Sequence, residues 1–161
     1  MWCDSVRLSN SGIGRGAMDC GITLSGPASY EVVALMAKSI SAMYLLSALP
    51  EEEASMIELA VAEIGNNVVE HAYQDKPGGQ LEIRYQQLAT GIEITLVDSG
   101  IPMPEEQIDK VKNPQLVELD LDDPSTWLTS GRGLGIVDQV MDTQSYERLD
   151  ERNYFRMTKS V

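Results

Sequence analysis

The strongest pattern in the chain is a helical one that runs through Glu58–Tyr73. Apolar side chains recur there at spacings of three and four residues, the period of one buried helical face. They are Ile57, Val61, Ile64, Val68 and Ala72. At about 100° of rotation per residue, an acid, an amide and an imidazole form a second row beside this stripe: Glu63, Asn67 and His71. Asn67 and His71 are therefore expected at the edge of the core rather than in water. Packing alone does not require such groups there, whereas a ligand site does.

Each residue of this row also has a structural interpretation. Glu63 alone is typical of a solvated helix position, and Asn67 alone of a half-buried amide satisfied by the backbone. His71, the only histidine, is typical of a satisfied residue at the core edge. The row becomes informative only together with the motifs that follow it in the chain.

Composition and charge narrow the class of protein. At 161 residues, the chain is long enough for one domain with a substantial core. The formal net charge of −13 argues against nucleic acid or an anionic membrane as the main partner. No window reaches the roughly 20 apolar residues of a membrane span, and the N-terminus lacks the apolar run of a signal peptide. The two cysteines, Cys3 and Cys20, do not make a disulfide framework, so a cytoplasmic location is expected.

Gly and Pro residues, which favour turns and breaks, divide the chain into predicted elements. Residues 1–18, rich in Ser and Gly, are expected to form a loose leader before a single domain over residues 19–161. The expected elements of the domain are a strand at 22–24, a helix at 30–47, the central helix at 51–73, strands at 81–85 and 92–97, a short helix near 105–110, a helix at 136–141 and strands at about 143–149 and 154–159. Helices do not alternate with strands, so the order predicts an α+β two-layer sandwich. Its sheet would be mixed and largely antiparallel, with the helices on one face.

Residues 103–130 form the longest connection in this scheme. The segment is acidic, weakly periodic and broken by Pro104, Pro114 and Pro124. A connection of this length inside a compact domain is usually a lid or a binding loop. The sequence therefore predicts a lid here.

Two further motifs carry candidate chemistry. Asp98 ends an expected strand and is followed by Gly100, which is a common turn signal. A carboxylate in that place could also accept a hydrogen bond from a ligand amine, worth roughly 1.5–3 kcal/mol when charged. Gly131, Gly133 and Gly135 precede a helix, where backbone N–H groups can approach a phosphate. The alternative is a flexible hinge with close packing. The pattern is neither a P-loop nor a full dinucleotide fingerprint.

In this order, the pieces resemble the GHKL ATPase superfamily. Three motifs carry the resemblance: Glu63-x-x-x-Asn67-x-x-x-His71-x-Tyr73 is similar to its N box, Asp98-x-Gly100 to its first glycine box, and Gly131-Arg132-Gly133-Leu134-Gly135 to its second. Three motifs in this order, on the expected elements, are specific. Within the superfamily, the chain most resembles the anti-sigma-factor serine kinases, also called switch-protein kinases, over about residues 20–160.

The resemblance implies the Bergerat ATP-binding fold, in a GHKL-type kinase domain over residues 19–161 that uses ATP and Mg²⁺. Glu63 would be the general base for the acceptor hydroxyl, Asn67 would hold Mg²⁺ against the phosphates, and Asp98 would bind the adenine amine. The other implied cofactor-binding residues are His71, Gly100, Gly131, Arg132, Gly133, Leu134 and Gly135, with Arg132 beside the phosphates. One departure is Ile101-Pro102, where many relatives have another glycine.

The resemblance also implies partners. The chain would be an ATP-dependent serine/threonine kinase and anti-sigma factor, commonly a homodimer. It would phosphorylate a STAS-domain antagonist and sequester a sigma factor, with no direct nucleic acid or membrane partner. An alternative is an ATP-binding anti-sigma module with weak or no kinase activity, although the intact Glu63 favours the kinase. A third hypothesis is the ATPase part of a sensor histidine kinase. Because His71 lies inside the N box, only a split kinase of that type fits.

Overall fold

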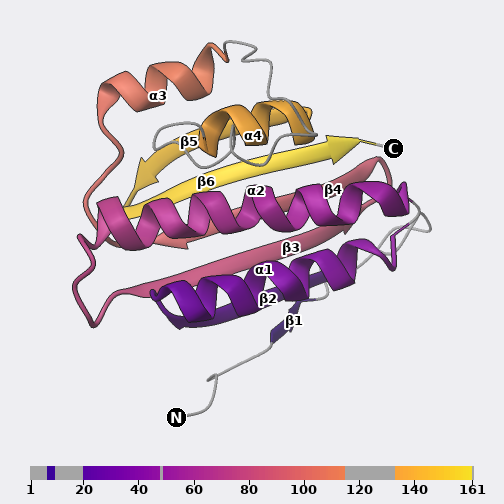
Figure 1. The fold of residues 1–161 in the computed structure, drawn as a ribbon, viewed down its shortest axis with the longest axis horizontal. Coiled ribbons are helices and arrows are strands. Elements are labelled where there is room, and N and C mark those ends of the chain that lie inside the picture. Colours follow the sequence, from indigo (N-terminus) through magenta and orange to yellow (C-terminus); the bar gives the residue numbers. More distant parts are fainter. Residues whose placement is uncertain (1–6, 10–19, 48, 115–132, 161) are drawn as a thin grey trace.

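The structure is a six-stranded sheet with helices packed on one face (Figure 1). The computed structural model describes residues 7–9, 20–47, 49–114 and 133–160. The strands are β1 (Arg7–Ser9), β2 (Cys20–Pro27), β3 (Gln80–Leu88), β4 (Gly91–Asp98), β5 (Thr143–Leu149) and β6 (Arg152–Ser160). The helices are α1 (Tyr30–Tyr44), α2 (Ala54–Asn67), α3 (Glu105–Lys112) and α4 (Gly133–Val140), with a 3-10 turn, η1 (Glu51–Glu53), before α2 and a π-helical turn, η2 (Val68–Ala72), after it. This arrangement confirms the predicted two-layer α+β class.

The strand order is β1-β2-β3-β4-β6-β5, and every described pairing is antiparallel. The hairpin of β5 and β6 turns through Asp150 and Glu151, both at positive φ (48° and 62°). Two residues with positive φ are the signature of a type I′ turn, whose twist matches that of the strands. The register of this hairpin pairs Asn153 with Arg148, and β4 pairs Asp98 with the same Asn153.

The core lies between the sheet and the helices. Side chains that are fully buried come from both layers: Val33, Ile40, Ile57 and Val61 on the helices, and Ile83, Ile94 and Met157 on the strands. Burying an apolar side chain of this size contributes about 1.5–3 kcal/mol. The two long helices pack closely, because a Cβ at Gly65 of α2 would lie 2.6 Å from Cγ1 of Val33 in α1. The apolar stripe of the central helix thus faces the core as predicted.

The central helix differs from the prediction at its end. The α-helical turns stop at Asn67, and the next five residues form the π-helical turn η2. A π-helical turn holds more residues than an α-helical one, so His71 leaves the row that it would share with Glu63 and Asn67. Asn67 is half-buried, as predicted, but His71 is exposed, and its expected place at the core edge is wrong.

Several element boundaries also differ. β2 extends over eight residues around the predicted strand at 22–24, and α1 ends at Tyr44 instead of residue 47. The helix expected to begin at residue 136 begins at Gly133. Glycine is an unfavourable residue inside helices, so helix propensity does not account for this earlier start.

Parts of the leader and of the predicted lid fall in the described ranges. β1 lies within the expected leader and pairs with β2, while the rest of residues 1–18 is outside the described residues. α3 supplies the short helix expected in the lid, but residues 115–132 are outside the described part, so the lid stays a prediction. No helix in the described ranges is long and apolar enough to cross a membrane.

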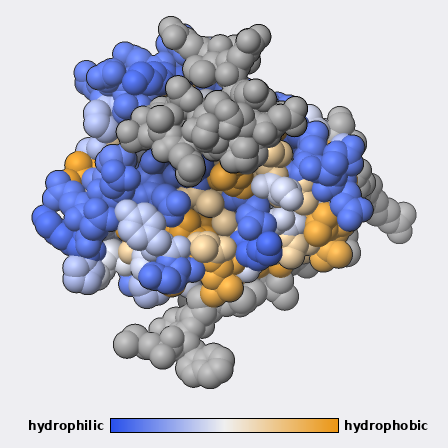
Figure 2. Space-filling view, viewed as in Figure 1, coloured by the Kyte–Doolittle hydropathy of each residue, from blue (hydrophilic) through white to orange (hydrophobic). Residues whose placement is uncertain are grey.

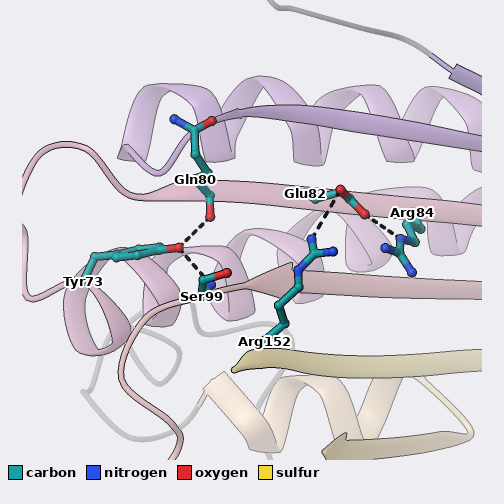
Figure 3. A network of polar contacts seen from close by, with 6 residues as sticks. All are labelled: Tyr73, Gln80, Glu82, Arg84, Ser99 and Arg152. Carbon is teal, nitrogen blue, oxygen red and sulfur yellow. Dashed lines mark hydrogen bonds and ion pairs between the residues drawn. The ribbon is translucent and has the colours of Figure 1, made fainter. Parts of the chain in front are cut away.

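The face of the sheet away from the helices carries paired charges (Figure 3). Glu82 accepts a hydrogen bond from Arg84 Nε at 2.6 Å, and its other carboxylate oxygen lies 3.5 Å from Nη2 of Arg152. Both guanidinium groups also lie within 6 Å of the Tyr154 ring centre, at 5.8 and 5.9 Å. Partly exposed pairs of this kind contribute about 0–1 kcal/mol each. They link β3 to β6 across β4, on the face that the helices leave open.

Candidate functional site

A cavity of about 730 Å³ opens on the helix-covered side, where α2 and its π-helical extension meet the end of β4. This volume lies in the range of about 300–1,000 Å³ that is usual for small-molecule sites. Six residues that line it come from five separate segments: Glu63, Asn67, Asp98, Met103, Gly133 and Asn153. The cavity therefore gathers residues from both the N-terminal and the C-terminal halves of the chain.

Asp98 forms one end of this cavity. It is buried, with 7% of its surface exposed. Its Oδ1 accepts hydrogen bonds from the Gly100 N–H at 2.8 Å and from Nδ2 of Asn153 at 2.7 Å. Within the described residues both bonds go to the same oxygen, which leaves Oδ2 as the atom for a ligand donor. Burial raises the pKa of Asp98, although the bonds from Asn153 and Gly100 lower it in part.

Asn153 holds a network behind Asp98. It is 2% exposed, and its Oδ1 accepts bonds from the Tyr146 hydroxyl at 2.8 Å and from Arg148 Nη1 at 2.7 Å. The Tyr146 oxygen in turn accepts the Met103 N–H at 2.9 Å, and Arg148 also donates to the Gly100 carbonyl at 3.1 Å. The network thus joins β5, β6 and the loop after β4, and it fixes the position of the acid.

None of the sequence motifs includes these network residues. The strands predicted at about 143–149 and 154–159 leave Asn153 in the turn between them, whereas it lies inside β6. The usable signal is the alternation of Tyr146 and Arg148 on β5, but that alternation identifies a site only when the register with β4 is known.

At the other end of the cavity, Gly133 begins α4 and lies against two residues of α2. A Cβ at Gly133 would lie 3.1 Å from Oε2 of Glu63 and 3.4 Å from Nδ2 of Asn67. A larger residue would therefore push against the acid and the amide. Burial raises the pKa of Glu63, which is half-buried among these neighbours. The structure thus brings three predicted site residues together.

The other predicted site residues occupy varied positions. His71 and Leu134 line the cavity, and His71 Nε2 lies 4.0 Å from a carboxylate oxygen of Glu70. A Cβ at Gly100 would lie 2.5 Å from the Ala72 carbonyl oxygen, so glycine is required for the close approach. Gly135 lies within α4 but does not line the cavity. Gly131 and Arg132 fall outside the described residues.

The two ends of the cavity differ in chemistry. The Asp98 end combines one available acceptor with apolar neighbours, Met103 and Phe155, which suits a flat ring that carries an amine. The Glu63 end combines an acid, an amide and the start of an eight-residue helix, whose N–H groups favour an anion. Among the described residues, no three His, Cys, Asp or Glu side chains form a metal-binding group. A Mg²⁺ ion there would need oxygen atoms from a ligand, which is how Mg²⁺ commonly binds with phosphates.

Comparisons with known proteins find a matching family and similar sequences. The chain matches the histidine kinase-like ATPase domain family over residues 26–159. It is 25% identical over 121 residues to the serine-protein kinase RsbW of Bacillus subtilis, covering 75% of this chain and 74% of that protein. RsbW of Listeria innocua is 26% identical over 121 residues, covering 75% of each chain.

A solved structure shows a likeness of fold. The catalytic domain of histidine kinase ThkA, in a nucleotide-free form, aligns with a TM-score of 0.51 at 13% sequence identity. The alignment covers 86% of this chain and 95% of that one.

Proposed function

Because the chain belongs to the histidine kinase-like ATPase domain family, we propose that it binds ATP in the cavity and transfers the γ-phosphoryl group to a serine of a partner protein. The observation that carries the proposal is a single cavity with Asp98 at one end and the pair of Glu63 and Asn67 at the other. The first end suits an adenine base, and the second suits phosphates and an acceptor hydroxyl.

The residues present fit the nucleotide. The adenine amine would donate to Oδ2 of Asp98, because Oδ1 already accepts bonds from Gly100 and Asn153. The phosphates would lie toward the start of α4, where Gly133 leaves room beside Asn67. Asn67 would bind Mg²⁺ through its amide oxygen, together with phosphate oxygens. When bound, the ion neutralises phosphate charge, which is the main requirement of phosphoryl transfer.

Glu63 is proposed as the general base. Its carboxylate would take the proton of the acceptor serine while the serine oxygen bonds to the γ-phosphorus. The bond from that phosphorus to the oxygen that bridges the β- and γ-phosphates of ATP would break in the same step, and ADP would leave with that oxygen and its electron pair. Partial burial raises the pKa of Glu63 above the usual value for Glu, and a base works best when its pKa lies nearer the working pH.

The protein substrate is proposed from the relatives. Two of the similar proteins are named serine-protein kinases, and the motifs resemble anti-sigma-factor kinases. A STAS-domain antagonist is therefore the proposed substrate, and a sigma factor the proposed sequestered partner. The alternative is an ATP-binding anti-sigma module without transfer. The placement of Glu63 beside Asn67 and Gly133 favours the kinase over this module.

A homodimer is proposed through the outer side of α1. Three leucines at this helix and its end are exposed, Leu35 by 63%, Leu45 by 47% and Leu46 by 87%. Figure 2 shows hydrophobic surface between charged groups on the side of the molecule that α1 and α2 cover. Exposed apolar groups that gather on one element often mark a protein interface. A second copy of the chain would bury them.

The proposal is tested by transfer of label from ATP-γ-³²P to purified STAS-domain proteins, with the labelled residue identified by mass spectrometry. The expected result is label on one serine, dependent on this chain and on Mg²⁺. A STAS protein with that serine changed to alanine is the control. Binding of ATP without transfer to any candidate would favour the binding module over the kinase.

A further inference from the structure

Tyr73 joins three segments through one hydroxyl group (Figure 3). It is not among the residues that line the cavity described above. The residue follows directly after the π-helical turn η2. Its hydroxyl donates a hydrogen bond to the Gln80 carbonyl at the start of β3, at 2.8 Å. The same oxygen accepts the backbone N–H of Ser99, which follows β4, at 3.0 Å. The end of the central helix is thus connected to the ends of two strands.

The aromatic ring of Tyr73 is also fixed in place. A Cβ at Gly79 would lie 2.6–2.7 Å from ring carbons of Tyr73, so the ring rests directly on this glycine. The preceding residue, Ala72, accepts the backbone N–H of Ile101 at 2.9 Å. Two consecutive residues at the helix end therefore hold the loop at residues 99–101 by one hydrogen bond each.

This loop supplies one of the two hydrogen bonds that hold the carboxyl group of Asp98. Ser99 is the next residue, and Gly100 donates its N–H to Oδ1 of Asp98 at 2.8 Å. If Ser99 moves, the direction of the Gly100 N–H moves with it, and so does the oxygen that is left for a ligand. Asn153 holds the same Oδ1 from the β6 side at 2.7 Å. The acid is held from two sides, by β6 and by the loop that Tyr73 anchors.

We propose that Tyr73 is a positioning residue for base recognition: its hydroxyl anchors Ser99 and thereby orients Asp98 toward the purine amine. The inference rests on the proposed function, because it takes the base to be adenine. Tyr73 does not touch the nucleotide in this arrangement. Its hydroxyl acts on the base end of the cavity, whereas the phosphate end at Glu63 and Gly133 is held by α2 and α4.

The test compares two variants that each remove one tyrosine hydroxyl. Tyr73→Phe keeps the ring on Gly79 and removes both hydrogen bonds. Tyr85→Phe is the matched control, because its hydroxyl bonds Gln87 Oε1 at 3.1 Å within β3 and does not line the cavity. Thermal unfolding of both variants verifies that they fold.

The first readout needs no nucleotide. Hydrogen exchange of the Gly100 amide reports its bond to Asp98, and this exchange should be faster in Tyr73→Phe than in Tyr85→Phe or the unchanged protein. The second readout is calorimetric affinity for ADP, for GDP and for inorganic tripolyphosphate, each with Mg²⁺. Loss of an ordinary hydrogen bond changes an equilibrium constant by about 2- to 12-fold. The Kd of ADP should rise by at least the lower end of this range, about 2-fold. The Kd of tripolyphosphate should not change, and the ratio of the GDP Kd to the ADP Kd should become smaller.

Each outcome decides the proposal. Faster Gly100 exchange with a selective loss of ADP affinity supports it. Unchanged Gly100 exchange, or equal losses for ADP and tripolyphosphate, would show that Tyr73 acts on the fold as a whole and would overturn it. If the unchanged protein binds none of the adenine nucleotides, the proposed function itself fails and the base-recognition role fails with it. That result is distinguishable because it appears before any variant is compared.

Discussion

Replacing Asp98 by asparagine removes the buried carboxylate at the base end of the cavity while the shape of the side chain is kept. The side chain keeps its size, and the asparagine Oδ1 can still accept from the Gly100 N–H and from Asn153 Nδ2, as the aspartate does at 2.8 and 2.7 Å. An NH₂ group then stands where Oδ2 would accept the adenine amine. Two donors would face each other, so the bond to the base is lost.

The expected loss follows from the strength of that bond. A charged hydrogen bond contributes about 1.5–3 kcal/mol, which corresponds to an increase of about 10- to 150-fold in the Kd of ADP. Guanine presents an acceptor at the corresponding position, so GDP should lose less affinity than ADP. Calorimetric titration with ADP and GDP in the presence of Mg²⁺ measures both.

The stability of the variant should not fall. Because burial raises the folded-state pKa of Asp98, the ionised carboxyl destabilises the folded state above that pKa. This cost disappears as the pH falls below the pKa of the unfolded chain. Asparagine removes it, so the variant should be at least as stable as the unchanged protein at pH 7, and the difference should shrink in acid.

A matched control exists in α4. Burial also raises the pKa of Asp138, which accepts a hydrogen bond from Gln144 and does not line the cavity. Asp138→Asn makes the same chemical change and should leave ADP affinity unchanged. If the unchanged protein binds ADP and Asp98→Asn binds it equally tightly, Asp98 does not recognise the base.

The remaining predictions concern transfer and assembly. Glu63→Ala should slow phosphorylation by roughly 10²- to 10⁴-fold in single-turnover assays with little change in ATP affinity, and a near-normal rate would reject Glu63 as the base. Asn67→Ala should weaken Mg²⁺–ATP binding and transfer together, so a loss confined to the rate would contradict its role as a metal ligand. The transfer rate should fall as the pH decreases, because Glu63 becomes protonated and can no longer accept a proton. Since burial raises the pKa of Glu63 above its ordinary value of 4.5, this fall should begin above pH 4.5. A rate that stays constant down to pH 4.5 would contradict this. Light scattering at tens of micromolar should give the mass of a dimer, and Leu46→Glu should give a monomer; a monomer in the unchanged protein would remove the proposed interface.

Local patterns were sufficient for much of the fold. The period of the central helix placed its apolar stripe on the core, and the strands predicted at 81–85 and 92–97 correspond to β3 and β4. Both features depend on residues close together in the sequence. The absence of alternating helices and strands then predicted the two-layer class correctly.

The π-helical turn η2 could not be predicted in this way. The end of this turn and the residue after it bond to a segment distant in the sequence: the Ala72 carbonyl accepts the Ile101 N–H, and the Tyr73 hydroxyl accepts the Ser99 N–H. A helical period alone continues through His71 without interruption. The exposed position of His71 is therefore a tertiary effect, which a single sequence does not display.

The residues of the candidate site also differ in whether local sequence predicts them. Spacing along the chain identified Glu63, Asn67, Asp98 and Gly133. Asn153 and Tyr146 did not, because their closeness to Asp98 comes from the pairing of β4 with β6 and of β6 with β5. Asp98 and Asn153 are 55 residues apart in the sequence. The register that brings them together cannot be predicted from local composition.

The central claim, that the cavity binds an adenine nucleotide, is tested most directly by an amide NMR titration with ADP and Mg²⁺. Saturable shifts are predicted at both ends of the cavity, for Gly100 and Met103 near the base and for Leu134 near the phosphates. Thr95 and Arg156, which lie on the open face of the sheet, should not move. If the folded protein shows no saturable shift at the cavity amides with millimolar ADP, or if the shifts lie only on the open face, the cavity is not a nucleotide site.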